Sequence, residues 1–78
     1  MHIHVIHENP AWLEPLAKAL AQLSPEQRQV VVLADIEEYS YQEIADIMGC
    51  SIGTVRSRLH RARALLRRLV TRAQQEQQ

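Results

Sequence analysis

The last 28 residues of this 78-residue chain carry seven arginines and no lysine. One acidic residue shares that segment, so its net charge is +6, whereas residues 1–50 carry two basic and eight acidic side chains, a net charge of −6. The planar guanidinium group of arginine forms paired hydrogen bonds with phosphate oxygens and with guanine O6 and N7, which a lysine ammonium group cannot do. The pattern predicts a polyanion-binding C-terminal segment and a separate acidic surface. The arginines are Arg56, Arg58, Arg61, Arg63, Arg67, Arg68 and Arg72.

A helical period of apolar residues runs through the same segment. Val55, Leu59, Ala62 and Leu66 fall on one stripe of a helix, which we expect to face the core. The opposite side combines hydroxyl groups, a small residue and guanidinium groups, and these residue types enter major grooves and hold phosphates. The helix N-terminus also attracts phosphate. The residues on this side are Gly53, Ser57, His60, Arg61 and Arg68, flanked by Thr54 and Arg56.

Capping signals divide the preceding residues into short helices. Residues 24–27 (SPEQ) and 40–43 (SYQE) are capping boxes, in which a serine hydroxyl and a glutamine or glutamate side chain satisfy free N–H groups at a helix start. An earlier helix is expected to begin near Trp12 or Leu13, because Pro15 is tolerated only in the first turn.

Two stretches decide how the remaining helices are joined. The apolar run at residues 30–33 (VVVL) could form a buried strand, since β-branched residues lose rotamer freedom in helices, but the capping box before it favours a helix that ends near Ile36. Gly49 is placed to end the next helix in a left-handed conformation. Ser51 is placed to cap the last helix, which we expect from Ile52 to about Arg72.

These signals predict an all-α fold, a small domain of about four helices with a C-terminal helix-turn-helix and no wing. Residues 1–10 are expected to form an extended or disordered arm, residues 11–73 the domain and residues 74–78 a frayed tail. The expected core is built by apolar residues from every helix. They are Leu16, Leu20, Val31, Leu33, Ile44, Ala45, Met48, Val55, Leu59 and Leu66.

The composition narrows the function classes. With 46% hydrophobic residues the chain can bury one small core, and it has no apolar run near the roughly 20 residues that span a bilayer. Its single cysteine excludes an internal disulfide and fits a reducing cytoplasm, where we expect the protein to act. The spacing indicates no set of catalytic side chains, so we expect no enzyme and no cofactor.

Three histidines near the N-terminus could hold a metal ion. His2 and His4 would lie on one side of a strand, with His7 close by. Apart from Glu8, no carboxylate or cysteine is spaced to complete the ligand set. We therefore expect no metal site in this segment.

Other reactive side chains have simpler interpretations. Cys50 has no base or second thiol near it in the sequence, so we expect it to pack in the turn of the helix-turn-helix. Asp35, Glu37 and Glu38 follow a helix end with no pocket to desolvate them, and they fit a partner-docking face or a solvated surface better than a pair of catalytic carboxylates.

Residues 40–45 (SYQEIA) and 53–63 (GTVRSRLHRAR) together resemble region 4 of bacterial sigma factors, most closely that of the extracytoplasmic-function (ECF) class. The resemblance covers about residues 13–69. It implies that the last helix binds the upstream (−35) promoter element of double-stranded DNA in transcription initiation. It also implies docking on the flap of the RNA polymerase β subunit and regulation by an anti-sigma factor, with the domain acting as a monomer.

Carried over by position, the resemblance assigns base reading to four residues of the last helix, nearly the set that the helical stripe selects. They are Arg56, Ser57, His60 and Arg61. It places phosphate contacts at Tyr41, Ser51, Thr54 and Arg58. Arg63 is counted with the phosphate contacts, although for Arg63, Arg67 and Arg72 phosphate contact and simple solubility are equally open interpretations.

Three residues depart from the pattern of that family. Glu38 stands where glycine is frequent, and a left-handed backbone there would cost a residue with a Cβ about 1 kcal/mol. Tyr39 stands where leucine is frequent, and Ser51 where proline is frequent. Serine suits a helix cap, so the change at Ser51 should be tolerated.

Two other functions remain open at the level of sequence. The chain could be a sigma-like interaction module that binds an anti-sigma factor without DNA, although such a role would not require arginines on the groove-facing side. It could also be the dimeric helix-turn-helix output domain of a transcription regulator, with Leu65, Leu66 and Leu69 forming the dimer seam.

Overall fold

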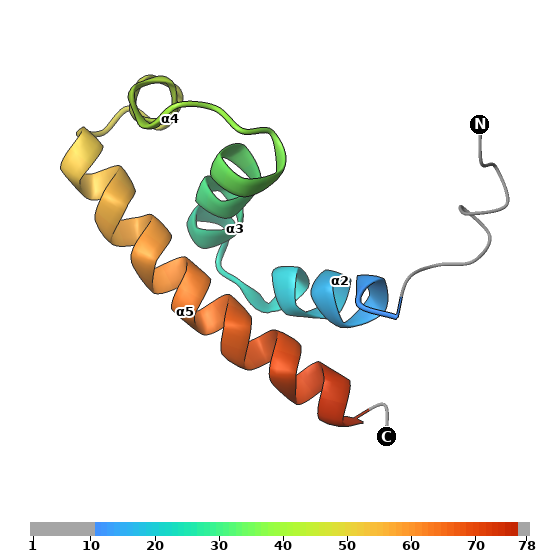
Figure 1. The fold of residues 1–78 in the computed structure, drawn as a ribbon. Coiled ribbons are helices and arrows are strands. Elements are labelled where there is room, and N and C mark those ends of the chain that lie inside the picture. The colour runs from blue at the N-terminus through green and yellow to red at the C-terminus, as the bar shows by residue number, and fades with distance from the viewer. Residues whose placement is uncertain (1–10, 77–78) are drawn as a thin grey trace, which may run out of the picture.

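The computed structural model describes residues 11–76, so the predictions for the N-terminal arm and its histidines lie outside the described residues. Residues 11–76 form four α-helices and one π-helical turn, without strands. Figure 1 shows the three shorter α-helices along one side of the long last helix, and each of them packs against it. The all-α prediction is confirmed. The elements are α2 (Leu13–Gln22), α3 (Pro25–Val31), η1 (Val32–Ile36), α4 (Tyr41–Met48) and α5 (Ile52–Glu76).

Both expected capping boxes are present. The Ser24 hydroxyl accepts from the Gln27 N–H at 3.2 Å, and Gln27 Oε1 accepts from the Ser24 N–H at 3.0 Å. The Ser40 hydroxyl accepts from the Glu43 N–H at 3.1 Å, and Glu43 Oε1 accepts from the Ser40 N–H at 2.8 Å. The bond from the Ser40 backbone, helped by the Ser40 side chain, holds the pKa of the Glu43 carboxyl below its ordinary value. These bonds fix where α3 and α4 begin.

The apolar run at residues 30–33 is helical, as the capping box favoured: its first half closes α3 and its second half begins η1. Its last turn widens to a π-helix, in which the Glu37 N–H donates to the Val32 carbonyl at 2.9 Å. The Tyr39 N–H then donates to the Leu33 carbonyl at 2.9 Å. The helix ends at Ile36 as expected, but with a geometry that apolar spacing alone does not reveal.

The turn between α4 and α5 takes the expected form. Gly49 has a φ of 65° and ends α4 in the left-handed region. The Ser51 hydroxyl accepts from the Thr54 N–H at 3.1 Å and so caps the start of α5. Cys50 lies between them, half-buried against the core, which confirms its expected packing role. α4, this short turn and α5 together form the helix-turn-helix.

The core differs from the expected one at four leucine and methionine positions. Leu16, Leu20, Met48 and Leu66 are only partly buried. Small residues are buried instead where α2 crosses the C-terminal half of α5, because two helix backbones approach closely only across small side chains. The residues buried there, which were not expected in the core, are Pro15, Ala19, Leu23, Leu69 and Ala73. Ala62 is also buried, as its place on the apolar stripe of α5 predicts.

The buried stripe of α5 therefore runs farther than expected. Leu69 is 9% exposed and Ala73 is 3% exposed, and both continue the stripe begun by Val55 and Leu59. α5 extends to Glu76, four residues past the expected end. No helix within residues 11–76 is both long enough and apolar enough to cross a membrane.

The loop between η1 and α4 contains a strained backbone. Glu38 has a φ of 59° and is the one non-glycine residue with a positive φ within the described part of the chain. A left-handed backbone costs a residue with a Cβ roughly 1–2 kcal/mol. Strain therefore lies at the position where the sequence departs from the glycine of the resembled family.

Replacing Glu38 with glycine is expected to raise the free energy of unfolding by about 0.5–1 kcal/mol, because relief of strain outweighs the added freedom of the unfolded chain. Glu37→Gly is the matched control, since Glu37 has an ordinary φ of −90° and glycine there adds only flexibility. Urea unfolding measures both variants. A Glu38→Gly protein no more stable than the parent would contradict the strain assigned to this loop.

Candidate nucleic-acid interface

The side of α5 that faces away from the core carries the residues predicted to contact bases. Because Val55, Leu59 and Ala62 are buried, the residues on the other side of the helix are turned to solvent. All four predicted base-reading side chains are exposed, and the structure brings them together over two turns of α5. These residues, Arg56, Ser57, His60 and Arg61, are called the reading face below.

Two small residues shape the reading face. The Ser57 hydroxyl donates to the Gly53 carbonyl at 2.9 Å, so its lone pairs are left to accept from a ligand. A Cβ built on Gly53 would meet one atom outside its own turn, Ser51 Oγ at 3.8 Å, which is ordinary contact. Packing among the described residues therefore does not require glycine at this position, and the first turn of α5 offers an open approach for a ligand.

Three predicted phosphate contacts lie at helix starts. The Ser51 and Thr54 hydroxyl oxygens are 3.0 Å apart at the start of α5, where free backbone N–H groups favour an anion. Tyr41 is the first residue of α4, and its ring is half-buried against the core. The structure places these side chains beside the reading face rather than on it.

The other two predicted phosphate contacts are already paired within the protein. Arg63 donates through Nε to Asp35 Oδ2 at 3.0 Å and through a second nitrogen to Asp35 Oδ1 at 2.5 Å. This carboxylate raises the pKa of Arg63. Arg58 lies 3.8 Å from the Glu26 carboxylate, and its guanidinium is 4.0 Å from Cys50 Sγ. These two arginines connect α5 to η1 and α3.

The partners of these arginines could not be predicted from the sequence. Asp35 and Arg63 are 28 residues apart, and no periodicity joins them. The helical stripe places Arg63 beside the buried face of α5 rather than opposite it. That position was the one sign in the sequence that Arg63 has a partner inside the domain. The pairing places Asp35 at a contact inside the domain, while Glu37 and Glu38 are exposed without an ion pair to the described residues.

The Asp35–Arg63 pair is expected to contribute modestly to stability. Both side chains are 39% exposed, and screening by solvent limits such a pair to about 0.5–1 kcal/mol. Asp35→Asn and Arg63→Gln should each lower the free energy of unfolding by up to that amount, and the double variant should lose no more than either alone. Urea unfolding of the four proteins measures this coupling, and fully additive losses would show that the pair does not tie α5 to η1.

The remaining five arginines of α5 have no ion pair among residues 11–76. Each is exposed along the helix, whereas Arg58 and Arg63 are half-buried. Five guanidinium groups without carboxylates repel one another, and a polyanion relieves that repulsion. They are Arg56, Arg61, Arg67, Arg68 and Arg72.

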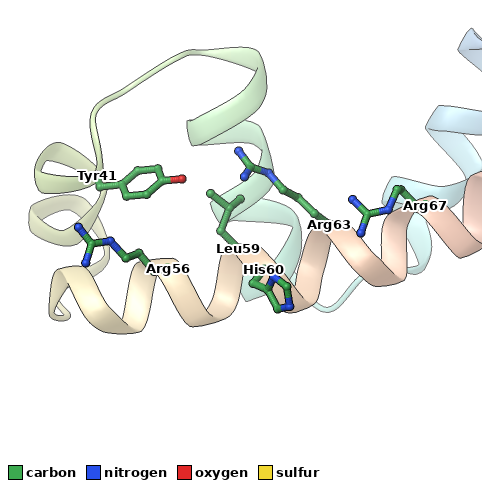
Figure 2. Close-up of a pocket in the computed structure, with 6 residues that line it drawn as sticks. All are labelled: Tyr41, Arg56, Leu59, His60, Arg63 and Arg67. Atoms are coloured by element: carbon green, nitrogen blue, oxygen red, sulfur yellow. The ribbon is translucent and has the colours of Figure 1, made fainter.

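Two hollows flank the reading face. The larger, about 470 Å³, lies between the start of α4 and the middle of α5, and in Figure 2 the Tyr41 hydroxyl and the Arg63 guanidinium point toward one another across it. Its lining residues are Tyr41, Arg56, Leu59, His60, Arg63 and Arg67. The smaller hollow, about 180 Å³, lies beside the start of α3 and includes Arg58 and Arg61. Both flanks of α5 thus present guanidinium groups around a recess.

No group of histidine, cysteine and carboxylate side chains among residues 11–76 is arranged to hold a metal ion. The charge, the hollows and the exposed Ser51 and Ser57 hydroxyl groups point instead to a phosphate-bearing ligand. Together with the helix-turn-helix, these features are typical of a nucleic-acid-binding domain.

Comparison with known proteins gives the family. The model of the family described as "Sigma-70, region 4" matches residues 13–66. The chain is 56% identical over 52 residues to the ECF RNA polymerase sigma factor SigE of Mycolicibacterium smegmatis, a match that covers 67% of this chain and 20% of that protein. It is 38% identical over 64 residues to the RNA polymerase sigma factor YlaC of Bacillus subtilis, covering 82% of this chain and 37% of that protein.

A third relative, an RNA polymerase sigma-E factor of Streptomyces coelicolor, is 49% identical over 61 residues, which cover 78% of this chain and 33% of that protein. No solved structure matches. The chain belongs to the sigma-70 region 4 family, in its ECF class, which confirms the resemblance seen in the sequence. It spans between a fifth and two fifths of the length of these relatives.

Proposed function

We propose that this chain binds the −35 promoter element as region 4 of an ECF sigma factor, in transcription initiation with RNA polymerase. The observation that carries the proposal is the reading face, which gathers Arg56, Ser57, His60 and Arg61 on the solvent side of the second helix of a helix-turn-helix. Membership of the sigma-70 region 4 family supports it, as do relatives whose names include RNA polymerase.

In this mechanism the first turns of α5 enter the major groove. Arg56 and Arg61 donate to guanine O6 and N7, while Ser57 and His60 contact neighbouring base edges. Ser51 and Thr54 hold a phosphate at the start of α5, and Tyr41 holds another at the start of α4. The reaction is binding alone, and we assign no catalytic step to the chain.

Arg58 and Arg63 have a second role in this proposal. Each contacts a phosphate next to the groove while it keeps or exchanges its carboxylate partner, Glu26 or Asp35. Because those carboxylates are exposed, a phosphate can compete for the same guanidinium group at modest energetic cost. The same proposal includes docking on the polymerase β flap and control by an anti-sigma factor in the cytoplasm.

The dimeric alternative loses its proposed seam. Leu69 is buried in the core of the single chain, and Leu65 and Leu66 pack against that core while partly exposed. A leucine seam for a second copy would need these side chains to be free. This arrangement favours a domain that meets DNA as one copy.

A titration of the purified chain with two duplexes tests the proposal. One duplex is selected by the chain from a random pool, and the other is the same sequence scrambled. We expect tighter binding to the selected duplex by 10³-fold or more, about the lower end for specific recognition, with affinity for both falling steeply as salt rises. Equal affinities would overturn base reading, and absence of binding to both at low salt would favour the interaction module that does not use DNA.

A further inference from the structure

The C-terminal half of α5 carries a second set of arginines, beyond the reading face and beyond residue 66, where the family match ends. Arg67, Arg68, Thr71 and Arg72 are all exposed there, and with Gln75 they line a hollow of about 320 Å³. The residues Arg67, Arg68, Thr71 and Arg72 are called the distal arginine patch below.

The distal arginine patch has no counter-charge among residues 11–76. Arg58 and Arg63, earlier on the same helix, each lie against a carboxylate, whereas none of the three arginines of the patch has an ion pair. Glu76 is the one acidic side chain after Asp46, and it is not paired with them. Three like charges within six residues repel one another, and no carboxylate among residues 11–76 is paired with them to offset this. A bound anion would offset the repulsion among these three arginines.

The patch is held on a firm support. Leu69 and Ala73, on the opposite side of the same turns, are buried, and Val70 packs against the core. α2 packs along α5, so these turns are part of the folded domain and not a fraying end. The helix is already ordered before an anion binds here. Binding therefore carries no cost for ordering the helix, and the affinity is higher.

The length of α5 places the patch with respect to the groove. Arg68 follows Ser57 by eleven residues, which is three helical turns, so both lie on the same side of α5 about 16 Å apart along its axis. The major groove is about 12 Å wide. A helix that crosses the groove with its reading face inside therefore carries Arg68 and Arg72 past the groove edge, where the sugar–phosphate backbone lies.

We propose that the distal arginine patch binds backbone phosphates of duplex DNA outside the base pairs contacted by the reading face. Arg67, Arg68 and Arg72 supply the charge, and Thr71 supplies a hydroxyl that now donates to the Arg67 carbonyl at 2.9 Å and can still accept a hydrogen bond. The inference rests on the proposed function and extends it. Affinity then depends on the presence of duplex next to the contacted base pairs as well as on their sequence.

Duplex length and salt dependence test the inference. The probes are a selected duplex that ends at the base pairs contacted by the chain, and the same duplex extended at either end by about ten base pairs, one helical turn. The intact chain should bind one of the extended duplexes more tightly than the short one. The variant R67Q/R68Q/R72Q should lose this gain and bind all three duplexes alike.

The salt slope gives an independent measure on the extended duplex. Each phosphate contact contributes about 0.9 to the slope of log affinity against log salt, so the triple variant should have a slope smaller by about 2.7. Raising salt from about 50 to about 200 mM should then weaken the intact chain about 40-fold more than the variant. Circular dichroism checks that the variant keeps its helices.

A charge-matched control separates the patch from net charge. K18E/Q22E also lowers the net charge by three, but on exposed positions of α2, which packs on the buried side of α5. This control should keep both the length effect and the larger slope. If the intact chain gains nothing from either extension while it still discriminates the short selected duplex, the inference is overturned and the proposed function stands. Loss of discrimination on the short duplex overturns the proposed function itself.

Discussion

Replacing Arg61 with alanine is expected to weaken binding to the selected promoter element by about 1–3 kcal/mol, and binding to scrambled duplex by much less. Arg61 is exposed on α5 and has no ion pair within residues 11–76, so its guanidinium group is free to meet a guanine edge. Truncation removes two hydrogen bonds that exist only with the right base. Titrations with both duplexes at one salt concentration measure the difference.

Arg61→Lys separates shape from charge at the same position. Lysine keeps the positive charge, so affinity for scrambled duplex and the salt slope should stay close to those of the parent, while the preference for the selected element falls. Lys18→Ala, on the exposed side of α2, should change neither quantity. Equal losses on both duplexes for Arg61→Ala would make Arg61 a phosphate contact and remove it from the reading face.

Replacing Ile44 with alanine is expected to lower the free energy of unfolding by about 2–5 kcal/mol. Ile44 is fully buried in α4 and belongs to the core that joins α4 to α5. A domain of this size has a total stability of about 5–10 kcal/mol, so the loss is a large part of it. Urea unfolding measures the change.

Ile47→Ala is the matched control on the same helix. Ile47 is 50% exposed, one turn from Ile44, and makes no comparable contact with the core. Its replacement should change stability by about 0.5 kcal/mol or less, as for most surface positions. Similar losses for the two variants would contradict the core described here, in which α4 packs through Ile44 and Ala45.

The parts of the fold that depend on neighbours in the sequence were predictable. Ser40 and Glu43 are three residues apart, and their reciprocal hydrogen bonds follow from that spacing in any helix start. Gly49 ends α4 in the left-handed region because a residue without a Cβ is not strained there. Glu38 adopts the same region with a side chain, and comparison with a family pattern was needed to suspect it.

The parts that depend on packing between distant segments were not predictable. Ala19 and Ala73 are buried where α2 packs against α5, and apolar spacing alone ranks leucines above alanines as core residues. The pair between Asp35 and Arg63 depends on how η1 lies against α5, which no local rule supplies. The seven arginines could therefore be recognised from sequence, but not divided into two that are paired and five that have no ion pair within residues 11–76.

That division has a functional meaning in the proposed mechanism. Arg58 and Arg63 pair α5 with α3 and η1 in the free protein, and a phosphate has to compete with their carboxylates. The exposed arginines have no carboxylate partner within residues 11–76, so their guanidinium groups can pair with a ligand. If all seven arginines of α5 were paired with carboxylates inside the protein, the fold could be similar, but the attraction for a polyanion would be weak.

Protection of guanine N7 from methylation by dimethyl sulfate tests most directly whether α5 enters the major groove, where that atom lies. The purified chain is bound to its selected duplex, and the methylated positions on both strands are mapped. The proposed mechanism predicts one short protected segment containing at least one guanine, and in Arg61→Ala at saturating protein the guanine contacted by Arg61 should regain its reactivity. Bound duplex whose guanine N7 atoms all remain reactive would contradict it.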